Sequence, residues 1–513
     1  MTETLATSIL HAILDARVYD VAVESELDSA ERLSSRLGNH IWLKREDQQP
    51  TFCYKVRGSY NKMSRLTDRE RKRGVIAASA GNHAQGVAKS AQEIGCDAVI
   101  VMPVTTPAVK LQAVERWGAR VELVGDSFDE AYQRAMEIQK KENRVFVHPF
   151  DDPDVIAGQG TVAPEILRQL GTKPLHAVFV PVGGGGLIAG LAAYIKQLRP
   201  DVQVIGVEPE EADSMAKSLE AGRRVRLKKV GIFADGVAVK QVGAHTFKLC
   251  REFVDEIVTV STDEICAAIK DICEDTRTLV EPSGALGVAG IKRWLRDQKG
   301  HGNRVRGKHI VAILSGANMN FDRLRHVSER AEIGERREAI LAVTIPEHSG
   351  SYLRFISILG DRNVSEFNYR YANESEAHIF LGVQINRTRE IESLVRRLQK
   401  QGYQTTDLTD NEIAKVHIRH LVGGRAPDVK DERLISFEFP ERPGALKNFL
   451  DQVGTDWNIT LFHYRNHGSD FGRVLCGMQV APGRQREFRK FLRKLGYQHT
   501  DETDNPVHRL FLA

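Results

Sequence analysis

A single lysine near the N-terminal end of the chain stands between an aromatic pair and a turn of small residues. The segment TFCYKVRGSY covers residues 51–60, with Lys55 at its centre. A lysine among apolar side chains loses water around its ammonium group, which lowers its pKa toward that of a usable nucleophile and base. Most lysines keep the ammonium group in water, so this segment alone favours a surface lysine. Chemistry at Lys55 therefore requires a partner elsewhere in the chain.

Four consecutive glycines, Gly183 to Gly186, are a candidate for that partner. They follow a Val-rich apolar segment and open a helix-like one. Successive glycines let backbone N–H groups converge on an anion, and the N-terminus of a helix adds to the attraction. One glycine would be enough for a tight turn, so four in a row favour a phosphate-binding loop.

The same glycines also allow a second interpretation. Gly184, Gly186 and Ala189 fit the dinucleotide pattern G-x-G-x-x-A. Glu208 follows roughly twenty residues later, where that pattern has the acid that binds a ribose hydroxyl. An NAD-dependent oxidoreductase is therefore the alternative from a different functional class. Against it, the glycines come late in the chain, whereas the dinucleotide pattern normally follows the first strand.

Two polar residues at the ends of other apolar segments complete the set. Asn82, in SAGNHAQG at 79–86, can donate and accept hydrogen bonds and suits a phenolic oxygen. Ser315 ends the apolar segment HIVAILS and can meet a ring nitrogen. A phosphate loop, an amide, a hydroxyl and a lysine able to form an imine together predict pyridoxal phosphate. His83, taken alone, is typical of a helix cap or a core histidine.

The elements that position these residues alternate between short apolar and longer amphipathic segments. We expect buried strands at residues 74–79, 97–103, 119–125, 144–149, 176–182, 202–209 and 309–315. Helical patterns lie between them, for example at 82–95 and 128–142. This order predicts an α/β fold with a twisted, mostly parallel sheet and helices on both faces.

Three glycine-containing segments follow strands of this region, at residues 79–86, 182–190 and 314–320. In open α/β sheets, ligands bind where loops leave the carboxyl ends of the strands. We therefore expect the three segments to meet at one crevice.

An internal repeat follows the charged segment ERAEIGERRE at 329–338. PEHSG at 346–350 recurs as PERPG at 440–444, NVSEFNYR at 363–370 as NITLFHYR at 458–465, and GYQTTDLTDN at 402–411 as GYQHTDETDN at 496–505. Each copy follows its original by 94 or 95 residues. The pattern within each unit is strand, helix, strand, strand, helix, strand, which predicts a doubled ferredoxin-like region.

The composition narrows the possible partners. The chain has 513 residues, of which 42% are hydrophobic and 27% charged, and its net charge is only +4. That balance gives no general attraction to nucleic acid. The six cysteines include no CxxC pair and no cluster at zinc spacing, so we expect reduced thiols and no metal site. The N-terminus does not resemble a targeting peptide, and no segment has the length of an apolar membrane span.

Several segments in combination resemble those of the biosynthetic threonine dehydratases (threonine deaminases), pyridoxal phosphate enzymes of the tryptophan-synthase-β-like class. These are residues 40–60, SAGNHAQG, HPFDDPDVIAGQGT (148–161), VPVGGGGLIAG (180–190), VGIFADGVAVK (230–240), EPSGAL (281–286) and LSGAN (314–318). The doubled C-terminal region resembles the two ACT-like regulatory domains of the same enzymes. The resemblance implies two catalytic α/β lobes and two regulatory domains. The expected boundaries are 1–325 for the catalytic domain, 326–338 for a linker, 339–413 and 433–513 for the ACT-like domains, and 414–432 for their connector.

The resemblance also implies roles for single residues. Lys55 is similar to the Schiff-base lysine, Asn82 to the partner of the cofactor's 3′-oxygen, and Ser315 to the residue at the pyridine nitrogen. A neutral residue at that nitrogen suits β-elimination. The phosphate cradle is expected at Gly183, Gly184, Gly185, Gly186 and Leu187. The residues expected to face the substrate carboxylate are Ser79, Gly81 and His83.

Two positions distinguish this chain within the resemblance. The family usually has Ser-Phe-Lys where this chain has Cys53-Tyr54-Lys55. Tyr54 still offers a ring beside the cofactor, and cysteine is nearly isosteric with serine. Serine racemases of the same fold have serine where this chain has Ala80, which favours elimination without racemisation.

The implied activity is the deamination of L-threonine to 2-oxobutanoate and ammonia, the first step of isoleucine biosynthesis. L-Serine is the alternative substrate, as in serine dehydratases. The resemblance further implies isoleucine as inhibitor, valine as opposing effector, a homotetramer and a cytoplasmic location. Segments 346–350, 363–370, 440–444 and 458–465 are the candidates for the effector site, with ordinary turns and core strands as an equal alternative.

Overall fold

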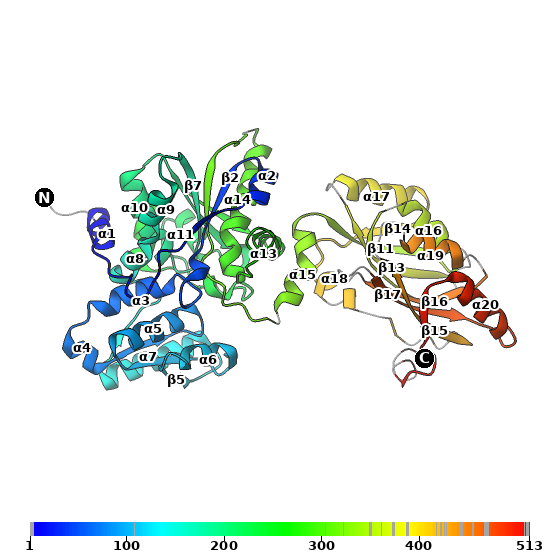
Figure 1. Cartoon of the computed structure of the whole chain (residues 1–513), viewed down its shortest axis with the longest axis horizontal. Helices are drawn as coiled ribbons and strands as arrows, with labels where there is room; N and C mark the ends of the chain where they lie inside the picture. The colour runs from blue at the N-terminus through cyan, green and yellow to red at the C-terminus, as the bar shows by residue number, and fades with distance from the viewer. Residues whose placement is uncertain are drawn as a thin grey trace. The chain divides into compact units, whose positions relative to one another are not determined.

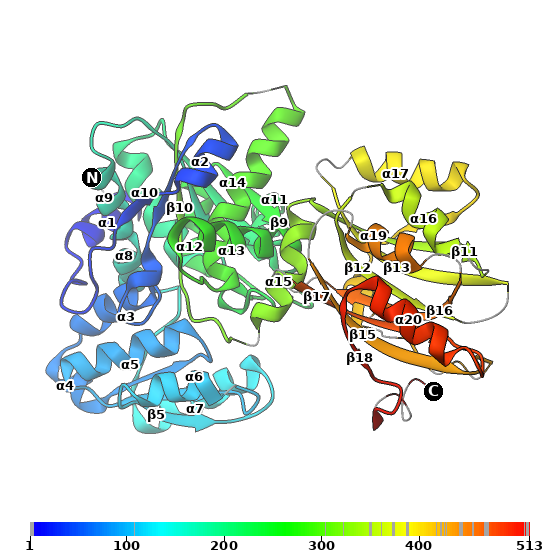
Figure 2. The ribbon, with the colours of Figure 1, turned by 45° about the vertical axis from the view of Figure 1, so that its right-hand side comes forward.

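The computed structural model divides the chain into two compact units, Met1–Ala331 and Glu332–Ala513. It describes residues 5–513 apart from 107, 303, 322, 348–350, 361, 372–374, 386–388, 417, 421–422, 425, 427, 441–444, 454–455, 466–470, 507, 509–511 and 513. Figures 1 and 2 show that each unit has sheets and helices of its own.

The larger sheet of the first unit has six strands in the order β1-β2-β10-β7-β8-β9. They are β1 (Leu27–Ser29), β2 (His40–Lys44), β7 (Leu175–Pro181), β8 (Gln203–Pro209), β9 (Glu256–Val260) and β10 (His309–Ile313). All neighbours run parallel except β1 and β2. Alternate residues of β7 enter different hydrophobic clusters, Val178 on one face and Phe179 on the other. Helices therefore cover both faces, which explains the continuous apolar sequence of the strand.

The smaller sheet of the same unit has four parallel strands in the order β5-β4-β3-β6. They are β3 (Val75–Ala78), β4 (Ala98–Met102), β5 (Arg120–Leu123) and β6 (Val145–Phe146). The two sheets form the two α/β lobes, which confirms the predicted fold class. Strands were expected near β3 to β8 and near β10, whereas β1, β2 and β9 were not predicted.

Helices surround both sheets of the first unit. They are α1 (Leu5–Leu14), α2 (Glu31–Leu37), α3 (Lys55–Ser64), α4 (Asp68–Arg73), α5 (Asn82–Ile94), α6 (Ala108–Glu115), α7 (Phe128–Glu142), α8 (Pro153–Gly160), α9 (Val162–Leu170), α10 (Gly186–Leu198), α11 (Ser214–Glu220), α12 (Ala244–Phe253), α13 (Thr262–Thr276), α14 (Pro282–Gly300) and α15 (Arg323–Gly334), with short 3₁₀ turns η1 (Glu46–Gln48), η2 (Glu210–Ala212) and η3 (Asp235–Val237). Local sequence fixes several starts: Ser127 and Glu130 form a capping box at α7, and Asp152 caps α8 ahead of Pro153. The expected linker at 326–338 overlaps α15 and the first residue of β11.

The second unit is built on one antiparallel sheet of eight strands in the order β14-β11-β13-β12-β16-β17-β15-β18. The first repeat contributes β11 (Glu338–Pro346), α16 (Ser351–Leu359), β12 (Val364–Arg370), β13 (Glu376–Gln384), α17 (Arg389–Lys400) and β14 (Gln404–Asp407), and the second contributes β15 (Glu432–Pro440), α19 (Ala445–Val453), β16 (Asn458–Arg465), β17 (Phe471–Gln479), α20 (Gln485–Leu495) and β18 (Gln498–Asp501). Between the repeats lie α18 (Glu412–Val416) and η4 (Ile418–His420). Both repeats have the predicted ferredoxin-like order, and β12 pairs with β16 to join them.

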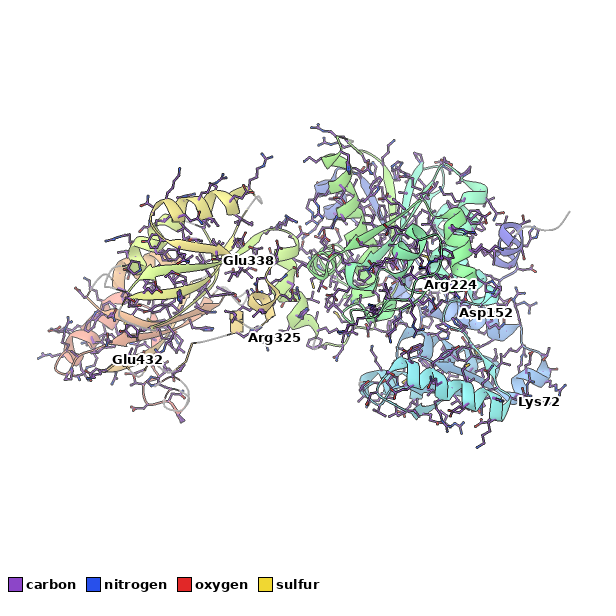
Figure 3. The ribbon with its side chains drawn as sticks, turned by 180° about the vertical axis from the view of Figure 1, so that it is seen from behind. Lys72, Asp152, Arg224, Arg325, Glu338 and Glu432 are labelled. Carbon is purple, nitrogen blue, oxygen red and sulfur yellow. The ribbon has the colours of Figure 1, made fainter. Side chains whose placement is uncertain are left out.

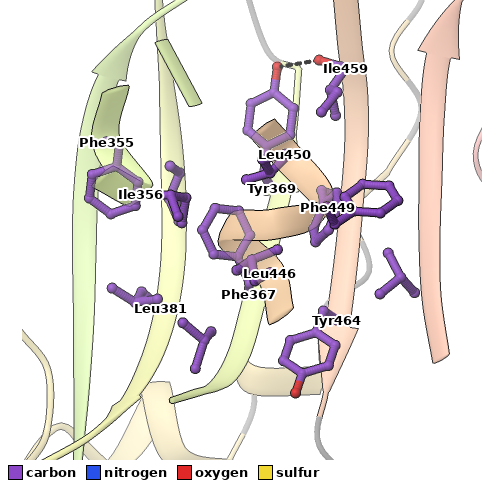
Figure 4. Packing of buried hydrophobic residues seen from close by; sticks show 14 of the residues in the cluster. Phe355, Ile356, Phe367, Tyr369, Leu381, Leu446, Phe449, Leu450, Ile459 and Tyr464 are labelled. Carbon is purple, nitrogen blue, oxygen red and sulfur yellow. Dashed lines mark hydrogen bonds between the residues drawn. The ribbon is translucent and has the colours of Figure 1, made fainter. Parts of the chain in front are cut away.

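A shared hydrophobic core holds the two repeats together. Phe367 of β12 packs edge to face on Phe462 of β16, with ring centroids 5.5 Å apart. Figure 4 shows Phe355 and Phe367 of the first repeat in the same core as Phe449 of the second. The apolar positions that the repeat conserves between its two copies therefore lie in one core rather than in two.

The repeats also carry matched buried carboxylates, Glu338 at the start of β11 and Glu432 at the start of β15 (Figure 3). Ser365 donates a hydrogen bond to Glu338, and Thr460 donates one to Glu432. Arg370 of the first repeat pairs with Glu432 of the second. This ion pair fixes the register between the two repeats.

Across the residues that the structure describes, no helix is long and apolar enough to cross a membrane. In the same residues no group of three or more His, Cys, Asp or Glu side chains could hold a metal ion.

Candidate active site

Lys55 is the first residue of α3, and the residues before it are fastened to the end of β10. Ala317 N–H donates to Phe52 O at 2.9 Å, and Tyr54 N–H donates to Ser315 O at 3.3 Å. Lys55 Nζ donates to Pro149 O at 3.0 Å and lies 5.3 Å from the centre of the Tyr54 ring. Burial lowers the pKa of Lys55. The fold therefore half-buries the Lys55 amine, a point that the sequence alone left open.

The glycine turn connects β7 to α10. Gly185 has φ +94°, in the left-handed region that favours glycine. A Cβ on Gly184 would lie only 2.1 Å from Phe150 Cγ, so a side chain there would displace the ring. Thr246 Oγ1 donates to Gly184 O at 2.7 Å and holds the turn from outside. Leu187 follows the turn and is buried in the core of the larger lobe.

Asn82 opens α5 in the smaller lobe and is held by residues of the larger lobe. Its Nδ2 donates to Glu281 Oε1 at 2.7 Å, and its Oδ1 accepts from Asn318 Nδ2 at 2.8 Å. Asn318 Nδ2 also donates to Thr51 O at 2.8 Å. These bonds fix the plane of the Asn82 amide while leaving each of its two polar atoms further hydrogen-bonding capacity.

Glu281 and Ser283 extend this network to Ser315. Ser283 Oγ donates to Glu281 Oε1 at 2.5 Å, and the buried Ser315 Oγ donates to Ser283 O at 3.2 Å. Burial raises the pKa of Glu281. Lys55, Asn82 and Ser315 are thus linked through short contacts, although they come from distant parts of the sequence.

The structure also places the three residues expected at the substrate carboxylate. Ser79 Oγ accepts from Gly81 N–H at 3.2 Å in the turn before α5. His83 Nε2 lies 2.8 Å from Val147 O, and burial, reinforced by the charge of Lys55, lowers its pKa to about 3. His83 is therefore neutral, its Nε2 donates to that carbonyl, and its side chain carries no charge for an anion.

Glu208, the acid that the dinucleotide interpretation requires, is already hydrogen-bonded to the backbone of another helix. Glu208 is fully buried, and its carboxylate accepts from Met215 N–H at 2.9 Å and from Ala216 N–H at 2.8 Å. Both N–H groups belong to the first turn of α11, so Glu208 caps that helix. Burial raises the pKa of Glu208 to about 8 against the effect of these bonds. A ribose hydroxyl would have to compete with the backbone of α11.

Several residues of the site were not assigned roles from the sequence. Glu281, Ser283 and Asn318 belong to the motifs EPSGAL and LSGAN, and Pro149 and Phe150 belong to HPFDDPDVIAGQGT, but the sequence gives none of them a role of its own. The contacts of Pro149, Glu281 and Asn318 reach across more than ninety residues to Lys55 and Asn82. No local spacing in the sequence signals such contacts.

Comparison with protein families gives two matches. Residues 21–316 match the family described as pyridoxal-phosphate dependent enzyme. Residues 329–418 and 423–512 each match the C-terminal regulatory domain of threonine dehydratase. The second match covers both copies of the internal repeat.

Comparison with individual proteins agrees with these families. The chain is 56% identical over 507 residues to the biosynthetic L-threonine dehydratase of Burkholderia multivorans, covering 98% of this chain and 99% of the relative. It is 51% identical to the corresponding Escherichia coli enzyme, covering 98% and 97%. Among solved structures, the processed threonine deaminase isoform 2 of Solanum lycopersicum is similar at TM-score 0.62 and 51% identity, covering 64% of this chain and 88% of that one.

Proposed function

The chain belongs to the biosynthetic threonine dehydratases, a family of pyridoxal-phosphate-dependent enzymes, and from this membership we propose that it deaminates L-threonine to 2-oxobutanoate and ammonia. The observation that carries the proposal is the half-buried amine of Lys55, linked through Tyr54 and Ser315 to the network that holds Asn82. This reaction is the first step of isoleucine biosynthesis. L-Serine remains a second candidate substrate of the same site.

The residues present fit pyridoxal phosphate. The glycine turn at the N-terminus of α10 leaves no room for a Cβ at Gly184 and offers backbone N–H groups to a phosphate. We propose that Gly183 to Leu187 hold the phosphate, Asn82 the phenolic oxygen, Ser315 the ring nitrogen, and Lys55 the aldehyde carbon. When bound, the cofactor accepts the electron pair left behind when a bond at the substrate Cα breaks.

The chain's own residues supply proton transfer and orientation. Because burial lowers the pKa of Lys55, a larger fraction of its amine is unprotonated near neutral pH and can take the proton from Cα of threonine. The substrate then loses its β-hydroxyl group as water, and hydrolysis of the aminocrotonate releases 2-oxobutanoate and ammonia. Ser315 carries no charge, so it does not stabilise a protonated ring nitrogen. A neutral residue at the ring nitrogen suits β-elimination.

The substrate carboxylate would bind at the N-terminus of α5. Gly81 occupies the N-cap position of α5 without a side-chain cap, so N–H groups of the first turn are free of that interaction. We propose that Ser79 and the backbone of Gly81 and His83 bind the carboxylate there. His83 would contribute through its backbone, because its imidazole is neutral and bonded to Val147 O.

Replacement of Lys55 tests the assignment directly. Lys55→Ala should abolish both the release of 2-oxobutanoate from L-threonine and the visible absorbance of the bound cofactor. Lys72→Ala, an exposed lysine on α4 in the same unit (Figure 3), is the matched control and should retain both. Full turnover by Lys55→Ala would refute the assignment.

The second unit supports regulation by an amino acid, and we propose isoleucine as inhibitor and valine as opposing effector. Segment 363–370 contains Tyr369, whose hydroxyl lies 2.6 Å from Glu347 Oε2 and 3.3 Å from Ile459 O. The ring of Tyr352 lies 4.7 Å from that of Tyr369, and within the part of the chain that the structure describes its buried hydroxyl has no hydrogen-bond partner. Figure 4 shows the hydroxyl of Tyr369 directed at Ile459. A carboxylate and an unpaired hydroxyl suit the ammonium and carboxylate groups of an amino acid.

Of the remaining candidate segments, 458–465 forms β16, whereas 346–350 and 440–444 are described only in part. Residues 348–350 and 441–444 lie outside the described residues, so the segments PEHSG and PERPG are not placed in full.

Glu347→Gln should raise the isoleucine concentration for half-inhibition at least tenfold, while Glu392→Gln on α17 should not. Equal sensitivity of the two variants would remove Glu347 from the effector site.

We further propose, from the family resemblance, that the protein is a homotetramer located in the cytoplasm. Light scattering of the purified full-length chain, with and without isoleucine, would measure the oligomeric state. A monomer under both conditions would contradict the proposal.

A further inference from the structure

The loop after β6 carries the sequence His148-Pro149-Phe150-Asp151, and we call these residues the HPFD loop. Its first side chain closes a tight turn: His148 Nδ1 accepts from Phe150 N–H at 3.2 Å and from Asp151 N–H at 2.8 Å. Asn and Asp side chains form the same kind of turn with N–H groups two and three residues ahead. His148 therefore acts here as an Asn-like turn former with a ring.

Two successive groups of the HPFD loop contact the proposed cofactor site, and the third caps a neighbouring helix. Pro149 O accepts from Lys55 Nζ at 3.0 Å. The Phe150 ring occupies the space beside Gly184, where a Cβ would come within 2.1 Å of it. Asp151 Oδ1 and Oδ2 accept from His245 N–H at 2.8 Å and Ala244 N–H at 2.7 Å at the start of α12.

The last of these contacts leads back to the glycine turn. α12 contains Thr246, whose Oγ1 donates to Gly184 O at 2.7 Å. Gly184 is therefore contacted both by Phe150 and by the helix that Asp151 caps. One loop thus sets both the partner of the Lys55 amine and the shape of the glycine turn.

The ring of His148 is held in the orientation that this turn requires. It packs edge to face on Phe150, with centroids 4.7 Å apart, and on Phe146 of β6 at 6.0 Å. Because Nδ1 accepts hydrogen bonds from two N–H groups, the ring proton resides on Nε2. Loss of the acceptor would leave two backbone N–H groups without their partner and release the loop.

We propose that His148 is a positioning residue for the proposed reaction, which acts through the HPFD loop to place the Pro149 carbonyl at Lys55 and the Phe150 ring at Gly184. The proposal rests on the proposed function, because it assumes that Lys55 and Gly184 serve the cofactor. It assigns to His148 no contact with substrate or cofactor.

A matched pair of substitutions tests the turn itself. The Oδ1 of asparagine stands two bonds from Cβ, as Nδ1 of histidine does, whereas the oxygen of glutamine stands one bond further. His148→Asn should keep the affinity for pyridoxal phosphate and kcat within threefold of the native values. His148→Gln and His148→Leu should each lose at least tenfold in both quantities, with KM for threonine changed less. His176→Leu, at a partly buried histidine of β7, is the control and should change neither.

The holoenzyme gives readouts that a purely structural role would not move. Cofactor affinity is measured by absorbance titration of the full-length protein with pyridoxal phosphate, and kcat and KM at saturating cofactor. Native-like values in His148→Gln and His148→Leu would overturn the proposal, as would equal losses in His148→Asn and His148→Gln. Failure of His148→Gln and His148→Leu to fold, with His148→Asn folded, would also overturn it, because the turn would then serve folding and not position. A native protein that neither binds the cofactor nor releases 2-oxobutanoate would instead refute the proposed function.

Discussion

Arg57 is the most informative target for a stability test, because it is a fully buried cation two residues beyond Lys55. Its guanidinium binds Glu46 through Nε at 2.7 Å and Nη2 at 2.8 Å, and Glu165 through Nη1 at 2.6 Å and Nη2 at 3.0 Å. Lys44 Nζ adds a second cation at 2.6 Å from Glu165. Two cations and two carboxylates therefore balance inside the larger lobe, and the side chains of all four are fully buried.

Arg57→Met removes one of the two cations and leaves a net negative charge without water. Breaking a buried ion pair by removing one partner costs about 3–5 kcal/mol in free energy of unfolding. For a unit of this size the midpoint of thermal unfolding should then fall by about 5 °C. Arg57→Met combined with Glu46→Gln restores the charge balance and should recover part of the loss.

Urea denaturation followed by tryptophan fluorescence measures this effect in the full-length protein. Trp42, Trp117 and Trp294 lie in the first unit and Trp457 in the second, so a Trp457→Phe background reports on the first unit alone. Arg134→Met, at an exposed ion pair with Glu122, is the control and should change the midpoint little. A loss below about 1 kcal/mol in Arg57→Met, or no recovery in the charge-balanced variant, would refute the electrostatic reasoning.

Three further predictions follow from single contacts. Gly184→Ala places a Cβ 2.1 Å from Phe150 Cγ and should lower pyridoxal phosphate affinity at least tenfold in an absorbance titration, whereas Gly300→Ala, with open space around it, should not. Because the pKa of His83 falls from 6.5 to about 3 in the fold, protonation favours the unfolded chain below pH 6.5; between pH 7 and pH 5 the native protein should lose about 2 kcal/mol more than His83→Asn in urea titrations. Arg370→Met leaves Glu432 without its cation and should cost the second unit about 3 kcal/mol, read from Trp457 fluorescence, whereas Arg396→Met on the exposed face of α17 should cost far less.

The elements best predicted from the sequence are those with strong local patterns. The Val- and Ile-rich strands β3, β4, β7, β8 and β10 are buried on both faces and form continuous apolar runs. The internal repeat predicted the doubled ferredoxin-like region, because two copies of one pattern must form two copies of one fold. In contrast, β1 is three residues long and β9 mixes exposed with buried positions, so neither produces a clear pattern.

The residues of the candidate site could be proposed from the sequence only in part, for the same reason. Lys55, Asn82, Ser315 and the glycines are unusual residues at the ends of strong patterns, so each could be identified locally. Glu281 could not, because its importance depends on its bond to Asn82, which lies 199 residues away. Pro149 contributes only a backbone carbonyl, and any residue has one. Contacts of this kind are decided by how the lobes fold against each other.

The site is held together mainly by protein groups that bind one another. Glu281 and Asn318 hold Asn82, and Pro149 holds Lys55, through hydrogen bonds of 2.7 to 3.0 Å. Under the proposed assignment, the Asn82 amide would bind a cofactor oxygen without giving up either of its bonds, whereas Lys55 would exchange Pro149 for a new partner. Binding therefore costs one hydrogen bond at the amine and little rearrangement at the amide. Since the amine must also be free to move a proton, a carbonyl partner that releases it easily suits Lys55 better than a carboxylate would, because an ion pair would raise its pKa and hold it charged.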